Sequence, residues 1–187
     1  MAQALFVTSE YIKSATVIDE NVEDKIIKLA IIDAQRLHIF PKLGTDLYNK
    51  YITDINTSGS AGVTGVYKTL MDNYIIPALC KWVLYEVSIS MNFKYRNKAI
   101  MTQNSDNAQP VDLGTLNNLR DEFKIAANEL TQRMIDYLCA NDTLYPEYTS
   151  NTDDGDKSPD NYIQNSPIWL GTQSVCDRPG KRDNIQL

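Results

Sequence analysis

The fold is decided by residues 19–51, which read DENVEDKIIKLAIIDAQRLHIFPKLGTDLYNKY. Asn21 is a suitable helix N-cap, and the acidic residues Glu23 and Asp24 that follow it suit the positive end of a helix dipole. Apolar residues then recur every three or four positions up to Ile39, as expected for one face of a helix. The pattern therefore predicts a first long helix over residues 21–39.

A helix break is predicted where this helix meets Phe40-Pro41. Proline has no amide hydrogen to donate, and it disfavours helical geometry at the residue before it. Gly44 follows shortly afterwards, and Thr45 is a suitable cap for a second, shorter helix over residues 45–54. We therefore expect two capped helices joined by a sharp turn.

The rest of the folded part also reads as helices joined by polar loops. The stretch 74–91 is apolar nearly all round, but Pro77, Lys81 and Glu86 interrupt it, so we predict a buried central helix and not a membrane span. The predicted elements are a short helix from Thr8 or Ser9 to Ala15, a flexible connection at 56–62, a helix over 64–92 that bends or restarts near Pro77, a minor irregular or short β element near 98–110, and a last helix over 112–141.

These elements predict an all-α fold, a small helical bundle with a long central helix. After Pro146 the composition changes, because Asp, Asn, Ser and Gly dominate and hydrophobic periodicity is lost. We therefore predict a helical domain over residues 1–145 and an extended C-terminal interaction arm over residues 146–187.

The composition is that of an ordinary globular protein. The chain has 187 residues, of which 43% are hydrophobic and 22% charged, and a net charge of −6. The acidic balance argues against a general nucleic-acid-binding surface. The three cysteines form no C-x-x-C pair and no secretory signal is recognised, so reduced thiols of an intracellular protein are expected.

Few residues suggest catalysis. His38 is the only histidine, which excludes multi-histidine metal sites. Its place in a last helical turn suggests a dipole contact or core packing, so a catalytic triad is not expected. Glu20 and Glu23 resemble half of the metal site of all-helical nucleotide pyrophosphatases, but the second half is absent. We therefore predict that the chain is not an enzyme and has no catalytic, cofactor-binding or metal-binding residues.

Two isoleucines fall on the polar side of the first long helix. At about 100° per residue, Ile32 and Ile39 lie among charged residues such as Arg36, opposite a broad apolar arc that includes Leu37. Either a second layer of the same chain or another subunit covers them, so both are candidates for partner contact. Asp33 falls inside the apolar arc and would need a polar partner if it is buried.

The C-terminal arm contains apolar residues that a wholly polar tail would lack. Pro167 favours an extended approach to the apolar triplet that follows it. A segment of this kind is expected to become ordered when it binds a partner surface. The alternative is that these are scattered hydrophobic residues in a disordered tail. The candidate partner-binding residues of the arm are Tyr162, Ile163, Ile168, Trp169, Leu170, Arg178, Lys181 and Arg182.

One basic cluster lies in the folded part, at Lys94, Arg96 and Lys98. Cations are expected at the end of a helix because they interact favourably with its dipole. The cluster is also a candidate for contact with DNA phosphates or an acidic partner.

The order of the elements resembles that of the head–tail connector (adaptor) proteins of tailed bacteriophages, most closely the neck-ring proteins of crAss-like phages. The resemblance covers about residues 5–148. It is carried by the segments DENVEDKIIKLAIIDAQ, FPKLGTDLYNKY, YIIPALCKWVLYE, NSDNAQPVDLGTLNNLRDEF and YLCANDTLYPEY.

This resemblance implies a structural virion protein of the neck, assembled in the bacterial host cytoplasm. Such a protein forms a homo-oligomeric ring, a dodecamer, beneath the portal protein, where it extends the DNA channel and helps to retain the packaged genome. It offers a docking face to the next tail or neck ring protein, and genomic DNA passes without sequence-specific contact. Neither a cofactor nor a membrane is implied, and the basic cluster at Lys94, Arg96 and Lys98 is the candidate channel-facing surface.

Two other functions stay open from the sequence. One is a small helical regulatory binding module, and the other is an all-helical metal-dependent nucleotide hydrolase. An enzyme of the second kind would titrate with metal or nucleotide, whereas a ring subunit would not.

Overall fold

The computed structural model describes residues 4–95, 100–102, 111–149 and 157–159. These residues are overwhelmingly helical, which confirms the predicted all-α class. The α-helices are α1 (Ser9–Ala15), α2 (Asp24–Ala34), α3 (Phe40–Leu43), α4 (Thr45–Ser58), α5 (Gly65–Leu70), α6 (Ile76–Asn92), α7 (Leu113–Ala140) and α8 (Pro146–Thr149). The other described elements are π-helical turns at Gln35–Ile39 and Met71–Ile75, 3-10 turns at Gly59–Gly62 and Asp142–Leu144, and strands β1 (Phe93–Tyr95) and β2 (Ile100–Thr102).

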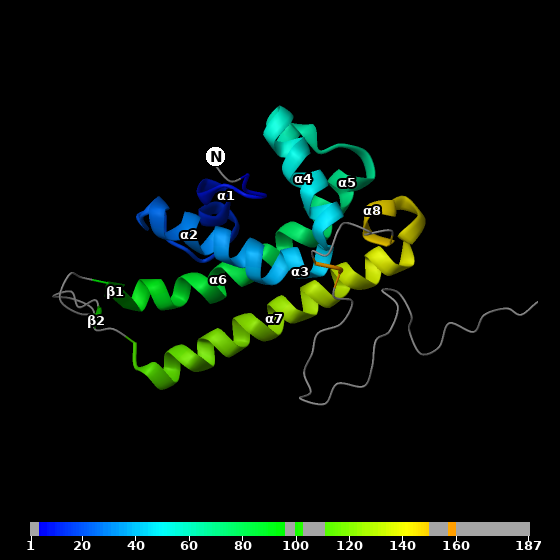
Figure 1. Cartoon of the computed structure of the whole chain (residues 1–187). Helices are drawn as coiled ribbons and strands as arrows, with labels where there is room; N and C mark the ends of the chain where they lie inside the picture. Colours follow the sequence, from blue (N-terminus) through cyan, green and yellow to red (C-terminus); the bar gives the residue numbers. More distant parts are fainter. Residues whose placement is uncertain (1–3, 96–99, 103–110, 150–156, 160–187) are drawn as a thin grey trace, which may run out of the picture.

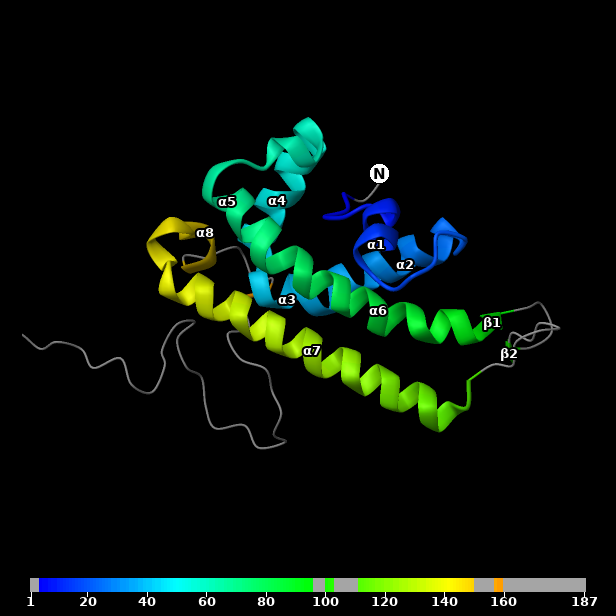
Figure 2. The same cartoon turned by 180° about the vertical axis from the view of Figure 1, so that it is seen from behind.

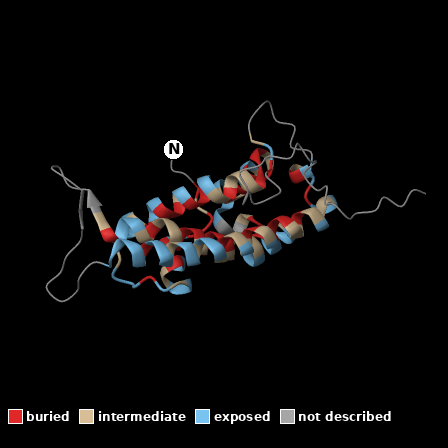
Figure 3. Ribbon diagram, turned by 90° about the horizontal axis from the view of Figure 1, so that it is seen from below, coloured by how far each residue is buried: buried red, intermediate tan, exposed pale blue. Residues whose placement is uncertain are grey.

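Helix α6 lies in the middle of the bundle. Helix α2 packs against one side of it and the long α7 runs antiparallel along the other, as two opposite views show (Figures 1 and 2). Leu79, Trp82 and Val83 of α6 are buried in the core. Figure 3 shows buried positions facing the inside of the bundle and exposed positions on the outer faces of the helices.

The β1–β2 pair extends the far end of the α6–α7 hairpin (Figure 1). The two strands are antiparallel, with Phe93 opposite Thr102 and Tyr95 opposite Ile100. They lie partly before the region, 98–110, in which an irregular or short β element was expected from the sequence.

Two helices begin where the sequence predicts. Thr8 caps α1, because its Oγ1 accepts a hydrogen bond from the amide of Tyr11 at 3.2 Å. Asp112 caps α7, because its carboxylate accepts from the amides of Gly114 at 3.0 Å and Thr115 at 3.2 Å. Both side chains satisfy amides that have no partner within the helix.

The other two predicted caps are wrong. Helix α2 begins only at Asp24, and the amide of Asn21 instead donates to the carboxylate of Asp19 at 3.0 Å, which forms a turn ahead of the helix. Thr45 is already inside α4, and its Oγ1 accepts from the amide of Lys157 at 3.1 Å. In both places a polar side chain satisfies a different backbone group from the expected one.

The predicted break at Phe40-Pro41 is also wrong in position. Phe40 is helical, and its amide donates to the carbonyl of Gln35, one residue further back than in an α-helix. A widened π-turn of this kind relieves the clash between a proline ring and the preceding turn, so Pro41 is accommodated in α3. The chain turns instead at Gly44, where φ is 77°. That left-handed conformation carries no steric cost at glycine.

A widened π-turn also precedes Pro77. The amide of Ile76 donates to the carbonyl of Met71 through a second π-turn, and α6 starts at Ile76 with the proline in its first turn. This confirms the predicted restart of the helix near Pro77. Phe40-Pro41 and Ile76-Pro77 therefore both follow a widened turn.

The first π-turn changes which residues of its helix are buried. Leu37, which the α-helical period placed in the apolar arc, is 62% exposed, whereas Gln35 and Ile39 are fully buried. Asp33 is exposed and needs no buried partner. An extra residue in one turn shifts the helical phase, so a regular period of 3.6 fails beyond it.

Helix α4 is longer than predicted. It continues to Ser58, and a 3-10 turn over Gly59–Gly62 occupies the place of the predicted flexible connection. Gly59 ends the helix with φ of 66°. At Gly62 a Cβ atom would collide with the carbonyl oxygen of Asp54, so only glycine allows this close return of the chain.

The described chain remains packed beyond the predicted domain boundary. Tyr145 and Tyr148 are both fully buried, and α8 packs against α4. Further on, the backbone of Lys157 pairs with Thr45. The remainder of the predicted arm, residues 150–156 and 160–187, lies outside the described residues.

Within the described chain, one stretch is long and apolar enough to cross a membrane by length and composition, Gly65–Asn92, with a mean hydropathy of 1.2. In the structure 44% of its most apolar window is buried inside the protein. Its α6 part packs between α2 and α7, which is the environment expected of a core helix.

Candidate interaction site

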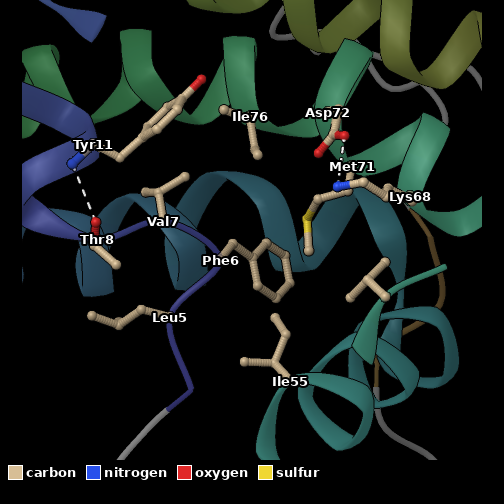
Figure 4. A pocket seen from close by; sticks show the side chains of 11 residues that line it. Leu5, Phe6, Val7, Thr8, Tyr11, Ile55, Lys68, Met71, Asp72 and Ile76 are labelled. Carbon is tan, nitrogen blue, oxygen red and sulfur yellow. Dashed lines mark hydrogen bonds and ion pairs between the residues drawn. The ribbon is translucent and has the colours of Figure 1, made fainter. Parts of the chain in front are cut away.

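An open groove of about 560 Å³ lies between the N-terminal segment, the end of α4 and the α5–α6 junction (Figure 4). Its walls combine three parts of the chain that are distant in sequence. The N-terminal segment contributes Phe6 and Val7, α4 contributes Ile55, and the junction contributes Met71 and Ile76. A volume of this size is in the range of known ligand and side-chain pockets.

Gln35 fixes the N-terminal wall of this groove. Its Oε1 accepts from the amide of Phe6 at 3.1 Å, and its Nε2 donates to the carbonyl of Ala4 at 3.2 Å and to the hydroxyl of Tyr48 at 2.8 Å. The ring of Phe6 packs against Tyr48 and Tyr51, with centroids 5.4 and 5.6 Å apart. The segment before α1 is therefore held rigidly, although it has no regular secondary structure.

The groove has an apolar interior and a polar rim. Phe6, Val7 and Met71 are buried, and Figure 4 shows Phe6, Met71 and Ile55 around the same space. At the rim Lys68 and Asp72 form an exposed ion pair of 3.0 Å, one helical turn apart. Such an arrangement suits an apolar side chain of a partner, because the interior offers contact area and the rim stays solvated.

Exposed apolar side chains are also found at the other end of α6. There Ile89 and Met91 at the end of α6, and Val111 and Leu113 at the start of α7, are between 36% and 58% exposed. We call these four residues the tip surface. The β1–β2 pair continues from this same end of the α6–α7 hairpin (Figure 1).

His38 is part of the core packing and lies outside the groove lining. Its ring stacks on the indole of Trp82, with centroids 3.6 Å apart and planes inclined by 4°, and its Nε2 lies 2.8 Å from the carboxylate of Glu86. The indole NH of Trp82 in turn donates to Thr131 at 3.0 Å. The single histidine thus joins the end of the first long helix to α6 and, through Trp82, to α7.

The cysteines described by the structure are structural thiols. Cys80 is buried, and burial raises the pKa of its thiol to about 11, which keeps it protonated and unreactive at neutral pH. Cys139 is half-buried and forms no disulfide. No group of three or more His, Cys, Asp or Glu side chains in the described ranges is placed to hold a metal ion.

A tyrosine cluster attaches residues 145–147 to α4 and α5. The hydroxyl of Tyr145 donates to the carbonyl of Val66 at 2.9 Å, that of Tyr51 donates to the carbonyl of Tyr67 at 2.9 Å, and that of Tyr67 donates to Glu147 at 2.7 Å. Burial raises the pKa of Tyr51, Tyr67 and Tyr145 well above the ordinary value of 10.0. The carboxylate of Glu147 raises the pKa of Tyr67 further.

These raised pKa values predict a loss of stability at alkaline pH. The unfolded chain releases tyrosine protons above pH of about 10, whereas the folded chain retains them, so the contribution of neutral Tyr51 is complete below that pH and lost as the pH rises through its raised pKa. We expect the free energy of unfolding to fall by up to about 1.4 kcal/mol per pH unit for this residue. Urea unfolding between about pH 9 and about pH 11 measures it. In Tyr51→Phe the alkaline slope should be shallower, and an unchanged slope would contradict the prediction.

The residues predicted from the sequence to contact a partner differ in their burial in the structure. Ile39 is fully buried in the core, so the same chain covers it, as the first of the two alternatives predicted. Its candidacy for partner contact is therefore wrong, and the phase shift at the π-turn is the reason. Ile32 is half-buried. The side chains of the basic candidates Lys94, Arg96 and Lys98, and the arm candidates Tyr162, Ile163, Ile168, Trp169, Leu170, Arg178, Lys181 and Arg182, lie outside the described residues.

The groove was not predicted from the sequence. The apolar pair Phe6-Val7 directly before the Thr8 cap was the available indication, because a hydrophobic residue ahead of an N-cap often packs against its own helix. Gln35 gave no indication, since a single glutamine on an amphipathic helix ordinarily faces solvent.

Residues 39–157 match DUF6712, a family of unknown function, and this match spans more than half of the chain. The chain belongs to this family. The match starts at the last residue of the first π-turn and ends at Lys157, the residue whose backbone pairs with Thr45. No curated protein and no solved structure matches the chain.

Proposed function

We propose that this protein is a structural ring subunit of a bacteriophage neck, a head–tail connector that joins the capsid to the tail. The observation that supports it best is the presence of two different apolar surfaces, the groove and the tip surface. Identical subunits that associate through two different surfaces make heterologous contacts, and such contacts close into rings when the rotation per subunit permits it.

The two surfaces are far enough apart to serve two neighbours. Ile76 lines the groove at the first residue of α6, and Ile89 and Met91 lie at the end of the same helix. A helix of 17 residues is about 25 Å long, so the surfaces are separated by about one helix length. One subunit can therefore contact a neighbour at each surface without a clash between the two neighbours.

Two side chains that are often catalytic in other proteins, the imidazole of His38 and the thiol of Cys80, are engaged in packing. His38 is stacked on Trp82 and paired with Glu86, and the thiol of Cys80 is buried and protonated. The charges at the groove rim, Lys68 and Asp72, are paired with each other. These contacts favour a structural role over the hydrolase alternative.

In this proposal the ring is a dodecamer that binds the portal protein on one side and the next tail or neck ring protein on the other. It is located in the virion, extends the DNA channel and helps to retain the packaged genome. The basic cluster at Lys94, Arg96 and Lys98 is assigned to the channel side, on the β1–β2 pair and the residues between its strands.

Negative-stain imaging with and without the cognate portal protein tests the proposal. We expect rings on the portal, and weak or no ordered oligomers of the protein alone, because the portal serves as the template. The matched control is a tip-surface variant, Ile89→Asp combined with Leu113→Asp, which should stay folded and fail to form rings. A protein that stays monomeric beside its portal, or that hydrolyses nucleotides with added Mg²⁺, would overturn the proposal.

A channel wall should bind duplex DNA only weakly, because tight phosphate binding would stop the genome from passing. The net charge of −6 agrees with weak binding. We expect a Kd no tighter than general non-specific binding, roughly 10⁻⁴–10⁻⁶ M at physiological salt, measured by fluorescence anisotropy. Nanomolar, sequence-specific binding would contradict the structural role.

A further inference from the structure

The apolar lining of the groove is partly exposed at Leu5, Ile55 and Ile76, above a floor of nearly buried side chains. Gln35 holds the N-terminal segment in place, and Phe6, Val7 and Met71 form the interior. A groove that is pre-formed in this way loses little conformational freedom when it is filled. Its occupant should be uncharged at the point of contact, because the charges at the rim already satisfy one another.

The sequence beyond the described body contains a segment with these properties. From Asn161 to Cys176 the chain has no charged residue, whereas Asp160 and Asp177 bound it on either side. Near its middle lie three apolar residues, Ile168, Trp169 and Leu170. The segment therefore has apolar side chains for contact, and the residues on either side of them are uncharged. Tryptophan is the residue type most often found as an energetic anchor in interfaces.

The point where this segment leaves the body is fixed. The backbone of Lys157 is paired with Thr45 at the start of α4, and Pro159 is buried. Thr45 is the first residue of α4, whereas Ile55, which lines the groove, lies near the other end of the same helix. An extended chain gains about 3.3–3.6 Å per residue, so ten residues from Pro159 reach Trp169 within about 35 Å.

We propose that the groove of one copy receives the segment Asn161–Cys176 of a neighbouring copy, with Trp169 as its anchor. A tail-to-groove contact between copies uses a different part of each partner, so it joins successive copies in one direction. Such a contact is heterologous and has the geometry that a ring requires. The biological role of this contact rests on the proposed neck function, but the contact itself does not depend on it.

The chemistry of the groove suits an indole. Phe6 offers an aromatic wall and Met71 a flexible thioether, which makes favourable contacts with aromatic rings and adapts to their shape. The side chains of Ile168 and Leu170 alternate with the indole in an extended chain, so one face of the segment enters the groove and the other faces the outside.

Mixing two full-length variants tests the proposal. Trp169→Ala removes the anchor and keeps the groove, whereas Ile55→Glu blocks the groove and keeps the anchor. Each variant alone should self-associate at least about thirtyfold more weakly than the natural chain, as expected for an interface anchor. An equimolar mixture should restore association as heterodimers in native mass spectrometry, because one partner supplies the segment and the other the groove. A mixture that associates no better than either variant would overturn the proposal.

A second measurement needs no groove variant. The full chain labelled with 5-fluorotryptophan has two fluorine resonances, and Trp169→Ala assigns them. We expect the Trp169 resonance to move with protein concentration as it enters the groove of another copy. A resonance that stays at the solvent-exposed position at all concentrations overturns the proposal. A shifted resonance in the dilute monomer also overturns it, since the segment then occupies its own groove.

The two proposals fail in different ways. If rings form on the portal with Trp169→Ala at the concentration needed by the natural chain, the docking inference is wrong and the neck function stands. If the two variants pair in solution but the portal assembles no ring, the docking inference stands and the neck function is wrong.

Discussion

Trp82→Ala is expected to destabilise the protein by roughly 3–5 kcal/mol, the cost of truncating a large buried aromatic side chain. The indole is only 5% exposed, stacks on His38 at 3.6 Å and meets the ring of Tyr85 edge-on at 5.7 Å. Truncation leaves a cavity between α6 and α7 that neighbouring helices fill only in part. Urea unfolding followed by circular dichroism measures the change.

A matched variant separates the packing of Trp82 from its hydrogen bond. Thr131→Val keeps the shape of the side chain and removes the acceptor of the indole NH, which lies at 3.0 Å. It should cost about 1–3 kcal/mol, the price of one unpaired buried donor. If Trp82→Ala costs no more than Thr131→Val, the ring itself contributes little and the packing argument is wrong.

Truncation after Leu144 is expected to abolish cooperative folding. It removes Tyr145 and Tyr148, which are both fully buried, and Glu147, which accepts the hydroxyl of Tyr67 at 2.7 Å. Replacing a buried aromatic residue by alanine costs about 3–5 kcal/mol, so two of them contribute roughly 6–10 kcal/mol to the free energy of unfolding. This is comparable to the whole stability of a typical domain. Thermal melting followed by circular dichroism should show a broad, low transition.

Truncation after Pro159 is the matched control. It keeps the tyrosine cluster and the pairing of Lys157 with Thr45, so the melting temperature should stay within a few degrees of the full chain. If the chain that ends at Leu144 melts as sharply as the one that ends at Pro159, the predicted domain boundary after residue 145 is correct and the cluster contributes little.

The positions of most helices could be predicted from local sequence. Thr8 and Asp112 cap their helices as expected, and Pro77 marks a restart of the central helix. These features depend on residues within one or two turns of each other, so the sequence contains the necessary information. The all-α class follows from the same local patterns.

The orientation of the first long helix beyond Ala34 could not be predicted. A π-turn leaves no reliable mark in sequence, yet it buries Gln35 and Ile39 and exposes Leu37. The extra residue is tolerated because it makes room for Pro41 and lets Gln35 bind the N-terminal segment. A partner-facing surface inferred from regular helical spacing was therefore misplaced at Ile39.

The sequence by itself determined the helical class, the caps at Thr8 and Asp112, and the uncharged segment between Asp160 and Asp177. Each depends on residue types and spacing along a short stretch. Only the tertiary structure decided the groove, because its walls come from residues near positions 6, 55 and 71 that no local rule connects. The tyrosine cluster is of the same kind, since burial and hydrogen bonds between distant helices hold Tyr145 against Val66.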